Sequence, residues 1–447
     1  MMDLQTGVTL GVFAAVVLAI ALELLDIAVA ALLGVSSLIV SGILTAQDMA
    51  AVAQASGGTI ALLFGGMVVA RTLAPTGIFE HVGTRFLLAT GGSGKRFLLG
   101  LLALVAPVCA FLPNATVVIL LAPVVMRVAI ALEIDFVGPL VLTAIISNSA
   151  GLLTLVGDPA TFLVGSSISM TFGEYLRRVS FGGLLALLVL VVLLPWVFGG
   201  IWRVRRTLPE DVKPKALERP YLCVLTLTVL TAMILLFLFG DLLPVNVVPP
   251  AAAIVGCSLA LLVVYAAKVE PVERVLQDLD WRTLIFLSCM FLLVQAFTKT
   301  GILQGLSRNL YGWFGVEMLP VAFFMLGGVG VMSSLLANIP VVAAMIVVIK
   351  GYFVLAQVVP EEALGVLFSN WPASTLPVFV GMMFGATLGG NATLIGASAN
   401  VVAAGICAGR GKPVSFGTFL RYGVPFTLAQ LLVSALYVLG MNYMIGD

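Results

Sequence analysis

The chain has 447 residues, of which 61% are hydrophobic and 10% charged, with a mean hydropathy of +1.18 and a net charge of +1. Soluble domains carry close to 25% charged residues, so this composition predicts a polytopic membrane protein. The small net charge, without a basic stripe, excludes nucleic acid as a partner. The five cysteines stand singly in apolar segments, and we expect no disulfide, metal site or cofactor.

Apolar runs long enough to cross a bilayer occur equally in both halves of the chain. The first five lie near residues 6–22, 27–44, 59–74, 139–170 and 181–200. The other five lie near residues 221–240, 245–267, 283–298, 376–408 and 423–441. The sequence therefore predicts an all-α fold with five spans in each half.

Two further apolar segments, 97–131 and 318–350, are too long for one span. As a straight helix the first would extend about 50 Å at ~1.5 Å per residue, well beyond the ~30 Å hydrocarbon core. We expect each segment to fold back as a re-entrant helical hairpin. A pair of complete antiparallel spans is the alternative.

The two halves are related by a constant offset. Thr59, Gly77 and Asn114 return as Thr283, Gly301 and Asn338, each 224 positions later (283 − 59, 301 − 77, 338 − 114). After an insertion, the stretch 154–161 returns as 393–400. An odd number of spans per copy turns the second copy upside down, so we predict two inverted repeats, 1–202 and 221–447, joined by a linker at 203–220.

The distribution of basic residues predicts the orientation. A cytoplasmic linker would place 17 of the 22 lysines and arginines on the inside. The positive-inside rule selects this topology. We therefore expect a bacterial inner (plasma) membrane protein with both termini in the periplasm.

The segments 139–170 and 376–408 are each interrupted by small and polar residues, as expected of broken helices. The first contains Gly157-Asp158-Pro159, and the second contains Gly389-Gly390-Asn391-Ala392-Thr393. Glycine and proline unwind a helix and free backbone groups, which at membrane depth must be satisfied by protein, ion or water. We interpret both breaks as binding sites. A packing kink is the alternative.

Asp158 is the acid expected at membrane depth, where an ionisable group is costly unless it is hydrated or paired. We predict that it carries a coupling proton or cation. The alternative is a capping carboxylate for the half-helix that starts at Pro159.

Asn114 and Asn338 occupy equivalent hairpin tips. Their amides offer donors and acceptors without charge, which suits a small solute or ion. Alternatively, each amide only closes its own turn.

Four strings resemble the ion transporter superfamily, in particular the branch of arsenite/antimonite efflux permeases and the P protein. They are FLPNATVVILLAPVVMR, LVGDPATFLVGSSI, SSLLANIPVVAAMIVV and GATLGGNATLIGASANVVAAGICAGRGKPVSFGTFLRYGVP. The resemblance implies a dimeric scaffold and a transport part made of two hairpins and two broken helices. The substrate and ion site expected from the breaks and the resemblance consists of Asn114, Thr116, Asn148, Asp158, Thr161, Asn338, Asn391, Thr393, Ser398 and Asn400.

The sequence is less similar to the sodium-coupled dicarboxylate symporters, whose hairpin tips carry Ser-Asn-Thr. Pro113-Asn114-Ala115 and Ala337-Asn338-Ile339 stand there instead. Neutral amides, a few hydroxyls and one acid favour a small neutral hydroxylated solute, such as trivalent arsenic or antimony, exported against protons. The alternatives are a sodium/proton antiporter, a sodium-coupled small-anion symporter and, in a different class, an ion channel.

We do not expect an enzyme, because one histidine and one intramembrane acid make a poor nucleophile and base pair. The chain contains no phosphate-binding P-loop. ATP use would therefore require a separate soluble ATPase partner, which the resemblance to arsenite permeases allows.

Overall fold

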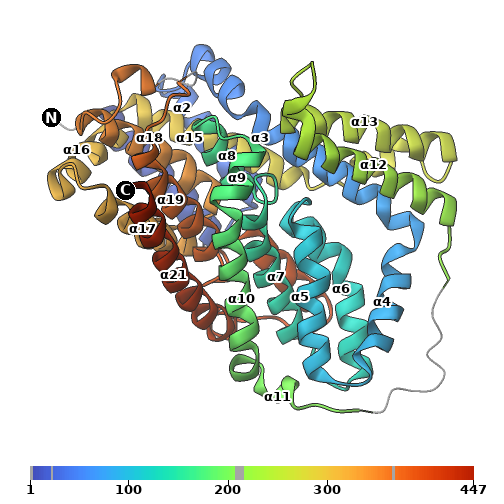
Figure 1. The fold of residues 1–447 in the computed structure, drawn as a ribbon. Coiled ribbons are helices and arrows are strands. Elements are labelled where there is room, and N and C mark those ends of the chain that lie inside the picture. The colour runs from blue at the N-terminus through green and yellow to red at the C-terminus, as the bar shows by residue number, and fades with distance from the viewer. Residues whose placement is uncertain (1–3, 22–23, 207–215, 365–367, 447) are drawn as a thin grey trace.

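The computed structural model describes residues 4–21, 24–206, 216–364 and 368–446 (Figure 1). In this part of the chain the regular elements are helices, and the β-type pairing is a single isolated bridge between Ser93 and Arg205. Nine of the described helices are long and apolar enough to cross a membrane. The predicted all-α polytopic membrane fold is confirmed. The middle of the predicted linker, 207–215, lies outside the described residues.

The chain begins with four helices, and side chains cap the N-termini of two of them. They are α1 (Leu4–Ala21), α2 (Ile27–Val40), α3 (Ala46–Leu73) and α4 (Ile78–Thr90). Asp26 caps α2 by accepting from the backbone N–H of Ala28, and Thr45 with Asp48 forms a capping box at the start of α3. Gly77, with φ of 75°, allows the sharp turn between α3 and α4.

Both segments predicted as hairpins consist of two helices joined by a short connection. The pairs are α5 (Gly94–Cys109) with α6 (Asn114–Ala131), and α17 (Met318–Leu335) with α18 (Asn338–Leu355). The helices of each pair pack on one another. The second pair extends to Leu355, past the predicted end at residue 350. Their depth in a bilayer and their entry from opposite faces stay predictions.

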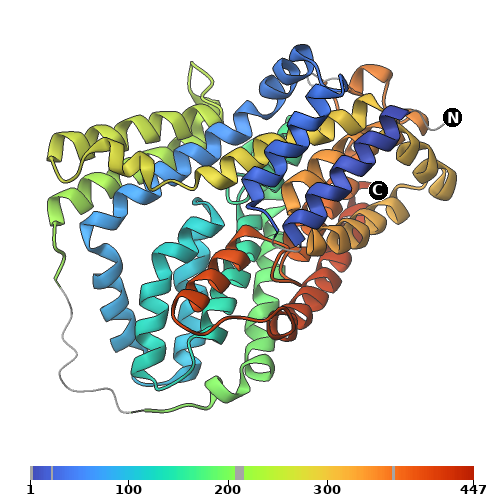
Figure 2. The ribbon, with the colours of Figure 1, turned by 180° about the vertical axis from the view of Figure 1, so that it is seen from behind.

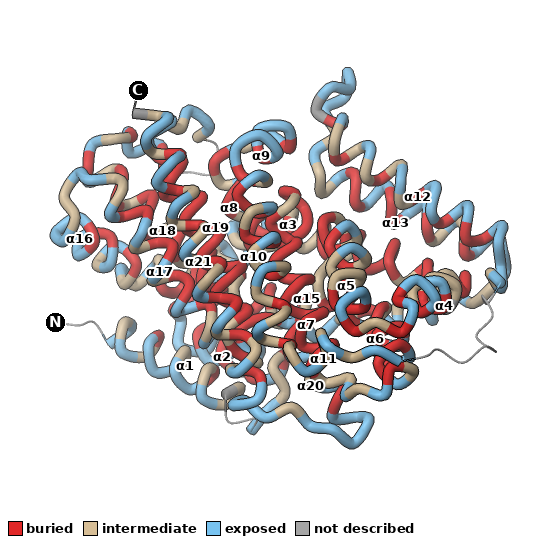
Figure 3. The backbone as a smooth tube through the Cα atoms, turned by 60° about the horizontal axis from the view of Figure 1, so that its bottom comes forward, coloured by how far each residue is buried: buried red, intermediate tan, exposed pale blue. Residues whose placement is uncertain are grey.

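Both segments predicted as broken helices contain two helical pieces separated by irregular backbone. The pieces are α7 (Val137–Ala150), continued by a 3₁₀ turn (Gly151–Leu153), then α8 (Pro159–Ser167), and in the second half α19 (Leu376–Gly389), then α20 (Ser398–Gly409). Every residue of α19 is buried, as is α7 from Gly138 onward. Figure 3 shows these two helices within the buried centre of the molecule. Irregular backbone therefore lies inside protein, as a membrane requires.

The remaining helices enclose these pieces. They are α9 (Phe172–Arg178), α10 (Ser180–Val197), α11 (Gly199–Trp202), α12 (Pro220–Phe239), α13 (Pro249–Ala267), α14 (Val272–Gln277), α15 (Trp281–Lys299), α16 (Ile302–Phe314) and α21 (Phe416–Gly446). Helix α3 packs on α13, and α15 packs on both α2 and α3. Helices α2, α3, α13 and α15 lie in a layer across the upper part of Figure 2, and we call this layer, with the helices packed along it, the scaffold layer.

The two halves of the chain interlock. The second hairpin helix of the first half, α6, packs on α20 of the second half, while α18 of the second half packs on α8 of the first. Each hairpin therefore directs its tip at a half-helix that is distant in sequence. This crossing brings Asn338 to Asp158.

The scaffold layer depends on a close helix crossing at Gly65. A Cβ added there would lie 2.4 Å from the backbone carbonyl oxygen of Ala253. Small residues permit such backbone contact between membrane helices.

We expect Gly65→Ala to force α3 and α13 apart and to lower the stability of the protein by about 1–3 kcal/mol, the usual cost of overpacking. Thermal unfolding in detergent measures the change. Gly57 lies on the same helix with open space around its Cβ position, so Gly57→Ala is the matched control. Equal stability of the two variants would contradict the importance of this crossing.

Candidate transport site

Asp158 lies in the break of the first broken helix and is 1% exposed. It is the N-cap of α8 and accepts a hydrogen bond of 3.1 Å from the backbone N–H of Ala160. Two side chains from the second half also donate to its carboxylate: Thr387 at 2.7 Å, and the Asn338 amide at 3.3 and 3.4 Å. All of these donors are neutral. Asp158 is therefore both the predicted cap and a contact between the two halves.

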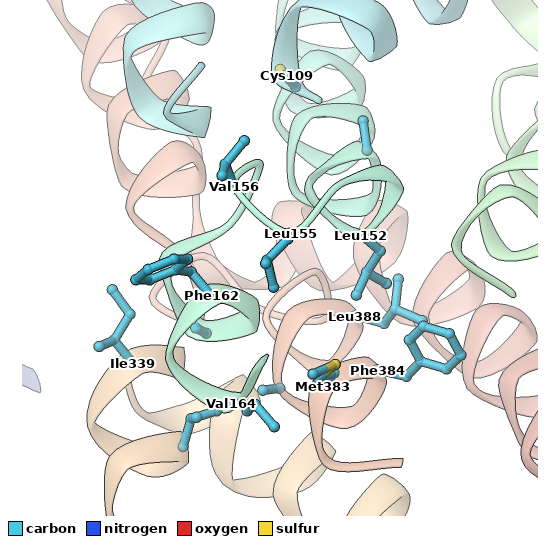
Figure 4. Packing of buried hydrophobic residues seen from close by; sticks show 14 of the residues in the cluster. Cys109, Leu152, Leu155, Val156, Phe162, Val164, Ile339, Met383, Phe384 and Leu388 are labelled. Carbon is cyan, nitrogen blue, oxygen red and sulfur yellow. The ribbon is translucent and has the colours of Figure 1, made fainter. Parts of the chain in front are cut away.

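Apolar packing holds these donors in place. Figure 4 shows Phe162 of α8 facing Ile339 of α18, and both side chains are buried. Phe162 follows Asp158 by about one helical turn and Ile339 follows Asn338 directly, so apolar side chains lie beside the polar contact. Thr161 adds a hydroxyl contact of 3.4 Å with Thr387.

Asn114, at the tip of the first hairpin, approaches the same place from the other side. A Cβ added at Gly151 would lie 2.9 Å from Cβ of Asp158 and 3.4 Å from the amide nitrogen of Asn114. Gly151 thus leaves room for both side chains. The side-chain oxygen of Asn114 is buried and has no hydrogen-bond partner among the described residues. A buried acceptor of this kind beside a carboxylate suits a bound proton donor or a cation.

The other predicted amides form a separate, interconnected cluster. Asn148 donates from its amide nitrogen to Asn391 and to Asn400, at 3.0 Å in each case. Asn400 donates at 2.8 Å to the carbonyls of Gly390 and Thr393, which belong to the second break. This amide therefore satisfies backbone groups that the break sets free.

Two residues absent from the predicted site complete this amide cluster. Asn391 donates to the hydroxyl of Ser149 at 3.0 Å and to the side-chain oxygen of Gln430 at 3.1 Å. Gln430 donates in turn to Ser149 at 2.9 Å and to the carbonyl of Ala186 at 3.0 Å. Because these side chains bond mainly to one another and to backbone carbonyls, we interpret the cluster as a structural contact between the two halves.

The two clusters are related by the 239-residue offset of the second repeat match (393 − 154). Thr161 corresponds to Asn400, and Thr387 corresponds to Asn148, so the Thr161–Thr387 contact is the counterpart of the Asn148–Asn400 bond. Asp158 corresponds to Ala397. The charge therefore stands in only one of two equivalent places.

Three predicted residues lie at the margins. Thr393 donates its hydroxyl to the carbonyl of Ser334, near the tip of the second hairpin. Ser398 is exposed at the start of α20. Thr116 is half-buried in the first turn of α6, and no hydrogen bond described for this part of the chain joins it to either cluster.

The sequence did contain signals for two of the residues that the prediction omitted. Thr387 is the repeat counterpart of Asn148, and Gln430 is a polar residue within the apolar segment 423–441. A polar side chain within a membrane segment is costly and therefore functional or structural.

Four helices begin around this region, and their N-termini carry partial positive charge. They are α6 at Asn114, α8 at Pro159, α18 at Asn338 and α20 at Ser398. The carboxylate of Asp158 occupies the N-terminus of α8 and is contacted by the first residue of α18. The arrangement stabilises negative charge without a lysine or arginine bonded to Asp158 in the described structure.

Comparison with known proteins identifies the family. The model of the citrate transporter family, CitMHS, matches residues 17–369. The chain belongs to this family. It is 43% identical to the uncharacterized transporter slr0753 of Synechocystis, over 96% of both chains, and 30% identical to the uncharacterized transporter Rv2684 of Mycobacterium tuberculosis, over 96% and 97% of the two chains.

The human P protein is 26% identical over 87% of this chain and 54% of its own length. The predicted resemblance to the ion transporter superfamily and its P protein branch is therefore confirmed. Together with the apolar helices, these matches make the chain a multi-pass secondary transporter of small solutes.

We expect Gln430→Leu to destabilise the fold by about 2–6 kcal/mol, because it removes a buried partner from Asn391 and from the carbonyl of Ala186, at ~1–3 kcal/mol per group. Gln304→Leu, at an exposed position of α16, is the matched control. Thermal unfolding in detergent compares the two. A fully stable Gln430→Leu protein with altered solute affinity would instead assign the amide cluster to substrate binding.

Proposed function

We propose that the protein couples transport to a cation gradient at Asp158. The observation that carries this proposal is a buried carboxylate held between the two halves by neutral donors alone. A buried ionisable group is expensive unless it has a function. Thr387 of α19 and Asn338 of the second hairpin both donate to it, so movement of the second hairpin would remove the Asn338 donor.

A proton and a sodium ion are the two candidate coupling ions. A proton would neutralise Asp158 and remove the cost of a buried charge. Sodium would use the carboxylate oxygens with the unpartnered side-chain oxygen of Asn114, since hard cations prefer oxygen ligands. The same oxygens would serve a sodium/proton antiporter.

For the substrate, we propose trivalent arsenic or antimony, exported across a bacterial inner membrane. At neutral pH both are neutral trihydroxides, and the donors and acceptors near Asp158 are neutral amides and hydroxyls. The resemblance to arsenite permeases adds two candidate partners, a second copy of the chain and a soluble ATPase.

A small carboxylate, such as citrate or a dicarboxylate, is the second candidate substrate. Two observations favour it: the family is described as a citrate transporter family, and four helix N-termini gather near Asp158. Half-helix N-termini bind anionic substrates in other transporters. In this case Asp158 would need its proton or cation bound before the anion enters.

Uptake into everted membrane vesicles separates these substrates. Trivalent arsenic, citrate and succinate would be compared under imposed proton and sodium gradients. Gradient-driven accumulation of trivalent arsenic supports the first proposal, and accumulation of citrate or succinate supports the second. Ion conductance without concentrative transport would identify a channel and reject both.

We expect Asp158→Asn to abolish gradient-driven transport while leaving expression near normal, because the amide keeps the shape and the cap but does not titrate. Asp135→Asn, at an exposed carboxylate that pairs with Lys412, is the control for loss of one acid. Transport is measured in the same vesicles. Full gradient-driven transport by Asp158→Asn would show that Asp158 serves only as a helix cap.

The inverted-repeat topology has its own test. We expect single cysteines introduced by Lys95→Cys and Arg127→Cys to react with a membrane-impermeant reagent from the cytoplasm. Glu317→Cys, at the base of the second hairpin, should react from the periplasm, because inversion sends this hairpin in from the other face. All three positions are exposed. Reaction of all three from one side would contradict the inverted repeats.

A further inference from the structure

Two cavities lie where a hairpin tip faces the scaffold layer, and they differ greatly in size. The cavity beside the first hairpin has a volume of about 10 Å³, and the cavity beside the second has about 390 Å³. The small one lies between α3, α12, the first hairpin tip and the first break. The large one lies between α1, α15, α16, the second hairpin tip and the start of α20.

The two cavities occupy equivalent places in the two halves. Eight of the nine residues around the small cavity have repeat counterparts around the large one at offsets of 224 or 239. The pairs are Leu62–Phe286, Leu63–Leu287, Gly66–Met290, Phe111–Leu335, Pro113–Ala337, Val156–Ile395, Pro159–Ser398 and Phe237–Phe13. The boundary between a hairpin tip and the scaffold layer, which we call the seam, therefore occurs twice. It is closed around the small cavity and open around the large one.

Apolar protein atoms fill the closed seam. A Cβ added at Gly66 would lie 3.1 Å from Cδ of Pro113, so the first hairpin tip sits directly against α3. At the open seam the counterparts, Met290 and Ala337, both line the large cavity. Residues that line an open cavity at the second seam thus correspond to residues that apolar protein atoms cover at the first seam.

The large cavity is apolar and unsealed. Thr283, Asn338 and Ser398 are the polar side chains among its lining residues. Several of its apolar lining residues on membrane helices are exposed, including Leu335 at 56% and Val401 at 49%. Its mouth therefore opens among exposed apolar side chains of helices that are apolar enough to lie in a membrane. Water would find few polar partners in such a space, and an empty one would forfeit dispersion contacts.

We propose that the large cavity binds an acyl chain of a membrane lipid. The apolar lining, the volume and the exposed apolar side chains at the mouth all fit a hydrocarbon chain, and ligand cavities of this size bury mostly apolar surface. The chain supplies at the open seam the packing that Phe111, Pro113 and Phe237 supply at the closed one. It therefore acts as a wedge between the second hairpin and the scaffold layer.

The wedge lies next to the coupling site. Asn338 lines the cavity and also donates its amide to Asp158. Helix α18 already packs on α15 beside the cavity, and a move of the hairpin tip into the cavity, as the first tip packs against α3, requires the chain to leave. Occupancy by lipid thus holds Asn338 in its present position.

Photolabelling tests the proposal without reference to transport. The full chain is reconstituted in bilayers that contain a phosphatidylcholine with a diazirine near the end of one acyl chain, and labelled peptides are identified by mass spectrometry. We expect label at Met290 and Met345 inside the cavity and at the lipid-facing Val192 of α10, but not at Met383 in the core.

Filling the cavity gives the decisive comparison. Ala344→Trp places an indole in the cavity, whereas Ala251→Trp places one at an exposed position of α13. Labelling of Met290 and Met345 should fall severalfold in the first variant and stay unchanged in the second, with Val192 labelled in all. Val294→Phe, on α15, provides the same readout if Ala344→Trp does not fold. Cavity labelling no stronger than at Met383, or unaffected by a folded filling variant, would overturn the proposal.

Discussion

A helix that breaks inside a membrane sets free backbone groups that only the protein itself can satisfy, and the rest of this structure follows from that constraint. Freed backbone groups cannot face lipid, so α19 and α7 from Gly138 onward are buried and other helices enclose them. The side chains that cap the freed groups come from both halves of the chain. The cost of breaking two helices is therefore offset by contacts that tie the halves together.

The two breaks are satisfied by different chemistry. In the second half, the Asn400 amide bonds two carbonyls of the break, and Asn148, Asn391 and Gln430 surround it with further hydrogen bonds. In the first half, a carboxylate caps the new helix and accepts a hydrogen bond from Asn338 at the tip of the second hairpin. An amide cluster keeps one protonation state, whereas a carboxylate has two. The two equivalent places therefore differ in chemistry: one holds a cluster of amides, and the other holds a group that can titrate.

The seams between hairpin tip and scaffold layer also differ between the two halves. The tip of the first hairpin packs against α3 through Gly66 and Pro113. The second hairpin also packs on α15 through α18, but a large cavity separates its tip from part of α15. The two equivalent seams of the molecule therefore differ in how tightly they are packed. Apolar side chains of the protein cover the first seam, and the proposed acyl chain would cover the second.

The sequence by itself determined the elements and the chemistry available to them. Hydropathy identified the membrane helices, the Gly-Asp-Pro and Gly-Gly-Asn strings marked the breaks, and the repeat offset paired Asn114 with Asn338. These features are local or periodic, so they are visible in one chain. Only the tertiary structure decided that Asp158 meets Thr387, 229 residues away, and that Asn148, Asn391 and Gln430 belong to a different cluster. Such contacts depend on how α8, α18 and α19 cross, and helix crossing is set by packing between distant segments, which no local pattern records.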